Sequence, residues 1–116
     1  MDDTNHPWLI LVPRVDGAIE WVDLSEAQQF ELTAEISRAS HALQIAFKPH
    51  KLNVAALGNL VSQLHVHVIA RFEQDIAWPR PVWGNATAQP YSPDELVLQV
   101  RRVQAALAGA AMLPGN

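Results

Sequence analysis

The stretch that decides the fold runs from Gln63 to Ile69 and reads Gln-Leu-His-Val-His-Val-Ile. Polar and aliphatic residues alternate along it, and β-branched residues are frequent, which favours a strand. Successive side chains of a strand point to opposite faces of the sheet. We therefore predict a strand that continues to about Phe72. One face would carry Gln63, His65 and His67, and the other would pack into a core.

Signals on either side of this stretch predict an α+β domain. Residues 8–12, 18–22 and 52–57 are the other predicted strands, and residues 25–47 and 94–108 the predicted helices. Ser25 and Gln28 have the spacing of a capping box at a helix N-terminus, and Ser92-Pro93-Asp94-Glu95 is an equally strong helix start. The proline-rich residues 73–93 are predicted to be irregular. Their tryptophans, Trp78 and Trp83, would either anchor this segment to the core or stack on a bound base.

The predicted helix at 25–47 has apolar residues on two sides. One side carries Leu32, Ile36, Ala39, Leu43 and Phe47, and roughly opposite lie Phe30, Ala34 and Ile45. A helix that is apolar on two sides usually packs against two neighbours. We predict that the second side contacts another subunit, and the alternative is that a C-terminal segment of the same chain covers it.

The composition of the chain argues against nucleic acid and membranes as partners. The chain has 116 residues, 8 basic against 12 acidic residues and a formal charge of −4, with no run of lysine or arginine that could follow a phosphate backbone. We therefore expect one domain over residues 1–116 and no nucleic-acid partner. Cysteine does not occur, and no apolar run is long enough for a bilayer or typical of a signal peptide. The expected location is the cytoplasm, without membrane association.

Two neighbouring imidazoles on a strand are compatible with three kinds of site. His-x-His is half of a common zinc or copper site, which needs further ligands. In a chain without cysteine these would come from His6, His41, His50 or a carboxylate, and nothing in the sequence ties them to the pair. The second kind of site is purely structural, with the two rings bonded to each other and to nearby carbonyl groups.

The third kind of site is a nucleophile for phosphoryl groups. A neutral imidazole can attack phosphorus and form a phosphoramidate, which water then cleaves. His65 has Gln63 and His67 beside it on its own face, an amide and an imidazole donor, and Gly58-Asn59 begins a loop that can add backbone N–H groups. This set of donors suits a phosphate better than a metal ion.

These residues resemble a known family. Leu64-His65-Val66-His67-Val68-Ile69, preceded by a glycine-containing loop and by Asn53, resembles the signature of the histidine triad (HIT) superfamily, in which three histidines alternate with hydrophobic residues. Leu9-Ile10-Leu11-Val12-Pro13-Arg14 is similar to that family's aliphatic strand ending in proline and a basic residue. The resemblance covers about residues 3–72. It implies a HIT-like α+β fold, with an antiparallel sheet, one long helix and a C-terminal helix, that forms a homodimer with a continuous sheet.

The resemblance also implies a function and a set of site residues. Family members hydrolyse or transfer nucleoside monophosphates through a nucleotidyl-histidine, generally without a metal. We therefore predict no metal and no other cofactor, and a purine nucleotide or nucleotide conjugate, such as a diadenosine polyphosphate, as ligand. By position, His65 is the nucleophile and His67 a phosphate contact. Asn53, Gly58 and Asn59 match family residues near the phosphate, and Asp3 matches an acidic residue that holds the ribose hydroxyls.

Two positions depart from the family pattern. Gln63 replaces the first histidine, and an amide can donate a hydrogen bond but cannot take a proton. Trp8 occupies the position of an additional histidine found in some branches, which removes another proton carrier. Our leading hypothesis is an enzyme that cleaves at the α-phosphate, with His65, His67 and Gln63 as catalytic residues. The alternative is a nucleotide-binding or regulatory protein with little turnover because the triad is incomplete.

Overall fold

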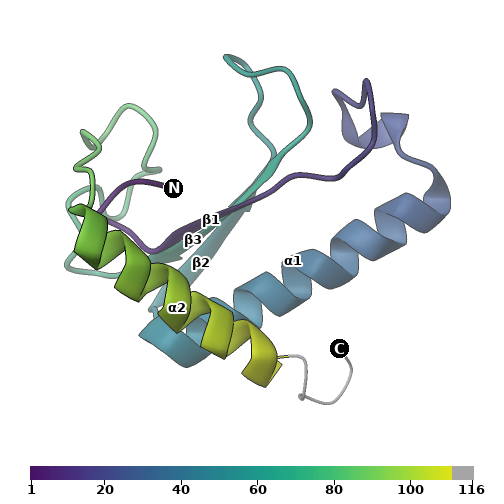
Figure 1. The fold of residues 1–116 in the computed structure, drawn as a ribbon. Helices are drawn as coiled ribbons and strands as arrows, with labels where there is room; N and C mark the ends of the chain where they lie inside the picture. Colours follow the sequence, from purple (N-terminus) through teal and green to yellow (C-terminus); the bar gives the residue numbers. More distant parts are fainter. Residues whose placement is uncertain (111–116) are drawn as a thin grey trace.

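The histidine segment forms the central strand of a three-stranded antiparallel sheet. The structure, a computed structural model, describes residues 1–110. Its elements are β1 (Trp8–Leu11), the 3-10 helix η1 (Trp21–Asp23), α1 (Glu26–Phe47), β2 (Lys51–Ala55), β3 (Val66–Arg71) and α2 (Pro93–Ala110). Strand β3 pairs with β1 on one side and β2 on the other. Helix α1 runs along the sheet, and α2 crosses the C-terminal part of α1 (Figure 1). The α+β class and the antiparallel sheet are thus as predicted.

The two faces of β3 pack against different parts of the chain. Val68 and Ala70 pack against Ala39 and Leu43 of α1, which forms the main core. The opposite face carries Ile69, which packs with residues of β1 and of the irregular segment after the sheet, namely Trp8, Val82 and Trp83. Because side chains alternate along a strand, His67 and Arg71 share this second face with Ile69. The face that carries the predicted chemistry is therefore covered by loops rather than by a helix.

Helix α1 begins as predicted. The Ser25 hydroxyl accepts a hydrogen bond from the Gln28 backbone N–H at 3.2 Å, and Gln28 Oε1 accepts one from the Ser25 N–H at 2.8 Å. This capping box satisfies backbone donors that the first turn leaves unpaired. The helix ends at Phe47, and the next residue, Lys48, has a left-handed backbone (φ 50°) and precedes Pro49. A proline there cannot continue the helix, so the chain turns back into β2.

The second apolar side of α1 stays open to solvent. Phe30 is 67% exposed and Ile45 46% exposed. Helix α2 packs beside this side, through Ala106 and Ala110 against Ala42. Within residues 1–110, α2 approaches Ile45 at Gly109 but leaves Phe30 and much of Ile45 exposed, so covering by a C-terminal segment also stays a prediction. Contact with another subunit remains a prediction.

Three predicted boundaries were wrong. Residues 18–22 form no strand; the Asp23 carboxylate accepts hydrogen bonds from the N–H groups of Ile19 and Glu20, and this local bonding favours the 3-10 turn η1. The histidine strand begins only at Val66, opposite Leu11, so the residues before it are not in the ladder. Strand β2 covers residues 51–55 rather than 52–57. Strand ends are the least certain part of a sequence-based prediction because partners set them.

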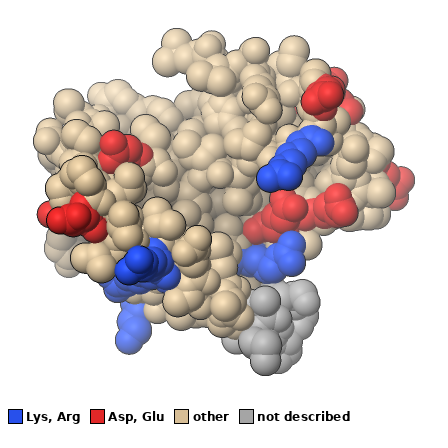
Figure 2. All heavy atoms as spheres, viewed as in Figure 1, with Lys and Arg blue, Asp and Glu red and all other residues tan. Residues whose placement is uncertain are grey.

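The C-terminal third agrees with the prediction. Residues 73–92 contain turns and bends but no helix or strand, and α2 begins at Pro93 with the Ser92 hydroxyl accepting from the Glu95 N–H at 3.3 Å. None of the helices in the described part of the chain is long and apolar enough to span a membrane. On the face shown in Figure 2, acidic and basic side chains lie in small separate groups of both signs, without a continuous basic patch.

Candidate active site

His65 is held in one orientation by the backbone just before it. Its Nδ1 lies 2.7 Å from the Gln63 carbonyl oxygen. A carbonyl can only accept, so Nδ1 carries the hydrogen and Nε2 keeps the lone pair in the neutral ring. The ring is only partly buried. His65 therefore presents an unprotonated nitrogen, oriented by a hydrogen bond at the other side of the ring, which is the arrangement that a nucleophilic imidazole needs.

Gln63 contacts His65 through its backbone rather than through its side chain. Its side chain is exposed and makes no hydrogen bond within residues 1–110, whereas its carbonyl oxygen orients His65. Gln63 and His65 both precede the first residue of β3, so this local turn, rather than strand alternation, brings them together. Any residue type at position 63 supplies the same carbonyl, which is why composition alone did not indicate this role.

Two hollows meet at His65. One, of about 170 Å³, is lined by the loop residues Gly58, Asn59 and Ser62 together with His65, and Trp21 and Glu20 close its far side. The other, of about 220 Å³, is apolar and is lined by Ile10, Val12, Val61, Gln63 and His65. The structure thus brings the predicted loop, Gly58-Asn59, to the predicted nucleophile. A group bound at His65 has room on both sides.

His67 is buried, and one of its ring nitrogens is held by a side chain of β1. Its Nδ1 accepts a hydrogen bond of 2.9 Å from the Trp8 indole N–H, and its ring also makes a backbone hydrogen bond to Leu57. Trp83 and His65 pack edge-on against it, with ring centroids at 5.0 and 4.9 Å. Burial lowers the pKa of His67, the neighbouring His65 adds to the effect, and the Leu57 bond opposes it. Trp8 already occupies Nδ1, so a phosphate contact of His67, which remains a prediction, would have to come from the other side of the ring.

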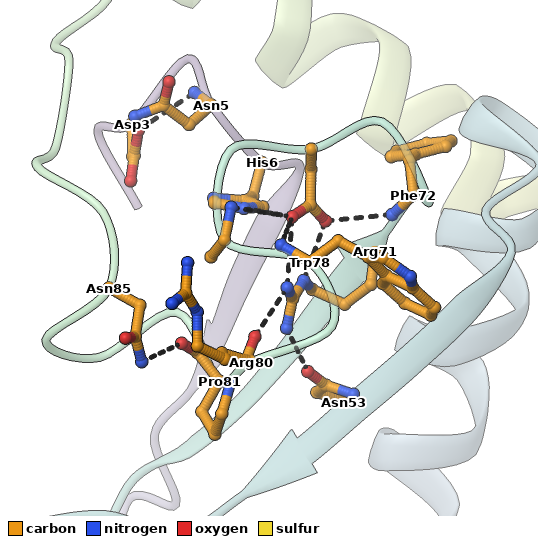
Figure 3. Close-up of polar contacts among 12 residues, drawn as sticks. Asp3, Asn5, His6, Asn53, Arg71, Phe72, Trp78, Arg80, Pro81 and Asn85 are labelled. Carbon is orange, nitrogen blue, oxygen red and sulfur yellow. Dashed lines mark hydrogen bonds and ion pairs between the residues drawn. The ribbon is translucent and has the colours of Figure 1, made fainter.

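Asn53 belongs to a buried polar network beyond His67 (Figure 3). Its Oδ1 accepts a 2.8 Å hydrogen bond from Arg71, which is 2% exposed. Arg71 also donates to both carboxylate oxygens of Asp75, at 2.8 and 3.1 Å, and to the Arg80 carbonyl at 2.8 Å. Since a guanidinium only donates, Asn53 must turn its oxygen to Arg71 and keep its Nδ2 donors for another partner.

Asp75 balances the charge of Arg71. Burial by itself would raise the pKa of Asp75, but hydrogen bonds from Arg71 and the Phe72 N–H, with the charges of Arg71 and His6, hold that pKa well below its usual range. His6 is fully buried, and its Nε2 lies 3.5 Å from Asp75 Oδ1. The network ties the end of β3 to the irregular segment through side chains that the sequence analysis did not single out.

Two other predicted residues, Asp3 and Trp78, make contacts away from His65. Asp3 is buried, and its Oδ1 accepts from the N–H groups of Asn5 and Gln89, which joins the N-terminal turn to the segment before α2. Its ribose contact remains a prediction that these bonds do not support. Trp78 packs against His50 and Arg71, so it anchors its segment. Within the described residues, no three side chains of the types that bind metals gather into a possible metal site.

Comparison with known proteins decides the family. A family model, the HIT domain, matches residues 1–74, which is more than half of the chain. The chain belongs to the HIT family. A histidine triad protein from Bradyrhizobium japonicum is 50% identical to this HIT protein, with a TM-score of 0.88 over 92% of this chain and 80% of the other. The matched segment agrees with the resemblance over residues 3–72.

Two further solved structures are similar. The histidine triad protein of Marinobacter aquaeolei VT8 is 43% identical, with a TM-score of 0.89 over 95% of this HIT protein and 80% of the other chain. That of Sinorhizobium meliloti 1021 is 42% identical, with a TM-score of 0.88 over 91% and 78%. A search of curated proteins gave no match. Members of the family are generally nucleotide-binding hydrolases or transferases.

Gly58 offers a test of the loop in this HIT protein. A Cβ at position 58 would lie 2.9 Å from the Val61 carbonyl oxygen and 3.8 Å from His65 Cε1. We expect Gly58→Ala to displace the loop and to weaken AMP binding by about tenfold, with a stability cost of about 1–3 kcal/mol. Calorimetry and urea unfolding measure the two effects. Gly109→Ala is the control, because a Cβ there meets nothing closer than 3.9 Å. Unchanged affinity in Gly58→Ala would contradict a binding role for the loop.

Proposed function

We propose that this HIT protein cleaves purine nucleotide conjugates at the α-phosphate through a nucleotidyl intermediate on His65. The observation that carries the proposal is the hydrogen bond from His65 Nδ1 to the Gln63 carbonyl, which leaves the lone pair on Nε2 of a ring that lines two hollows. Family membership supports nucleotide binding and hydrolase or transferase chemistry. The base, the leaving group and the reaction are part of the proposal.

The chemistry runs in two steps. In the first, His65 Nε2 forms a bond to the α-phosphorus, the bond from phosphorus to the leaving group breaks, and its electron pair departs with the leaving group. The imidazole becomes cationic, and the Gln63 carbonyl stabilises that charge through the Nδ1–H. In the second step, water attacks the phosphorus and loses a proton to solvent. The bond between phosphorus and Nε2 breaks, and its electron pair returns to Nε2. An acceptor alcohol or phosphate in place of water makes the reaction a transfer.

The remaining site residues bind the nucleotide in this proposal. The Gly58-Asn59 loop lines the hollow at His65, and its backbone N–H groups would stabilise the negative charge that accumulates on the phosphate. Asn53 contributes its Nδ2 to the nucleotide, because its oxygen is bound by Arg71. Asn53 lies opposite Ile69, one diagonal step from His67. It is therefore suited to the nucleoside rather than to the atom attacked by His65. A homodimer and a cytoplasmic location belong to the same proposal.

A substrate panel tests the activity. Adenosine phosphoramidate, diadenosine polyphosphates and the guanosine equivalents are incubated with the protein, and released nucleoside monophosphate is measured by chromatography. We expect release from at least one purine conjugate and less from a pyrimidine one. No release from any conjugate would reject the enzymatic proposal.

The second candidate is a nucleotide-binding protein without useful turnover. Its support is the exposed amide of Gln63, which cannot give a proton to a basic leaving group, together with the bonded and buried His67. Calorimetry distinguishes the two functions. Tight binding of AMP or GMP with no product from the panel would select the binding protein, whereas an enzyme releases AMP and binds it more weakly than the intact conjugate.

A further inference from the structure

Trp8 contacts His67 through a hydrogen bond as well as through packing. Trp8 stands opposite Ile69 in the β1–β3 register, and its ring centroid lies 5.5 Å from that of His67 at an angle of 65°. The indole N–H donates to His67 Nδ1 over 2.9 Å in a buried setting. Trp83 also packs against the His67 ring, but its indole makes no hydrogen bond to it. Two tryptophans thus flank one imidazole, and only one is bonded to it.

The direction of this bond fixes the hydrogen on His67. An indole nitrogen has a hydrogen and no lone pair for bonding, so His67 Nδ1 must be the acceptor. The neutral ring then carries its hydrogen on Nε2, the nitrogen that remains for the Leu57 backbone. A proton added to Nδ1 would displace the indole and leave a buried N–H without a partner. Trp8 therefore selects one tautomer and opposes the charged ring.

His67 in turn contacts the backbone just before the Gly58-Asn59 loop and the ring of His65. Leu57 directly precedes Gly58, and the loop that follows lines the polar hollow at His65. The His67 ring also meets the His65 ring edge-on, at 4.9 Å and 77°. A chain of contacts thus runs from the Trp8 indole through His67 to the loop and to His65.

We propose that Trp8 is a positioning residue of the active site, which fixes His67 as the Nε2–H tautomer so that His67 holds the Leu57–Gly58 backbone and the His65 ring in place. The inference rests on the proposed function. A histidine at position 8 could exchange a proton with His67, whereas an indole can only donate its hydrogen bond. Tryptophan at this position therefore fixes one tautomer of His67. The titratable groups that act on His67 are His65 and the N-terminal amine, and both oppose its protonation.

The first test needs no variant. Nitrogen-15 NMR of the imidazoles distinguishes the two neutral tautomers, and we expect His67 to be the Nε2–H form throughout the range from pH 6.5 to 8. A His67 that carries its hydrogen on Nδ1 would overturn the proposal even if the protein proves to be an active enzyme. This readout is also independent of turnover, so it separates failure of the inference from failure of the proposed function.

Trp8→Phe removes the N–H and keeps an aromatic ring, with Trp83→Phe as the matched control. In Trp8→Phe we expect a mixture of His67 tautomers, a higher pKa of His67 and a kcat/KM about five- to tenfold lower, as for a lost buried hydrogen bond. Trp83→Phe should retain the pure tautomer and the wild-type titration. If Trp8→Phe also retains the pure tautomer and the wild-type titration of His67, Trp8 only fills space and the proposal is wrong. Identical tautomer changes in the two variants would also contradict it.

Discussion

His65→Ala should abolish nucleotide release while leaving nucleotide binding nearly intact. Alanine removes the imidazole that the Gln63 carbonyl holds through Nδ1 and that lines both hollows. Removal of a nucleophile costs on the order of 10⁴-fold or more in turnover. The site keeps its loop donors, so we expect AMP affinity to change less than about tenfold. Chromatography of released AMP and calorimetry of AMP binding measure the two quantities.

His50→Ala is the control for this experiment. The His50 side chain is 53% exposed, pairs with Glu73 at 3.2 Å and lies outside the residues that line the hollows at His65. We expect wild-type release from it. Equal release by His65→Ala and wild type would show that another group attacks the phosphorus, and a loss in both variants would point to a general loss of structure.

The largest expected loss of stability follows from Arg71→Met. Methionine fills much of the same space but leaves the carboxylate of Asp75 buried without its main partner. It also removes the bonds from β3 to Asn53 and to the Arg80 carbonyl. Breaking a buried ion pair by removing one partner costs about 3–5 kcal/mol in the free energy of unfolding. Urea unfolding followed by tryptophan fluorescence measures the change.

Two variants show whether the loss comes from the unpaired charge. Arg38→Met removes an exposed cation from α1 and should change stability by less than about 0.5 kcal/mol. The double change Arg71→Met with Asp75→Asn removes both charges and should recover part of the loss, because the amide oxygen of asparagine can still accept from the backbone N–H groups that Asp75 binds. Stability of Arg71→Met within about 1 kcal/mol of wild type would contradict the structural role of the network.

The features that the sequence predicted well are set by local rules. The α1 start at Ser25 depends on a side chain three residues away, and the start of α2 depends on Ser92 in the same way. The order of strand, helix and histidine strand follows from hydrophobic patterning, which is a local signal as well. His65 and the loop at Gly58 were found because their spacing matches a family motif, and the structure places them around one hollow.

The contacts that the sequence did not reveal join distant residues. Trp8 and His67 are 59 positions apart, and their hydrogen bond depends on the β1–β3 register. The β1–β3 register cannot be read from the sequence. The sequence therefore predicted only a phosphate contact for His67 and the absence of a proton carrier at Trp8. Arg71 went unnoticed because nothing in its neighbourhood shows that it is buried. One available signal was Asp75, four residues after Arg71, but an exposed pair at this spacing is common and adds little stability.

The central claim is that the nucleotide becomes bonded to His65, and rapid acid quenching with mass spectrometry tests it most directly. The protein is mixed with an adenosine conjugate, quenched within one turnover and digested. We expect the peptide containing His65 to gain the mass of one adenylyl group, to lose it on longer incubation, and never to gain it in His65→Ala. An adenylyl group on a different residue, or AMP release without any labelled peptide at the earliest times, would show that the nucleotide is not bonded to His65.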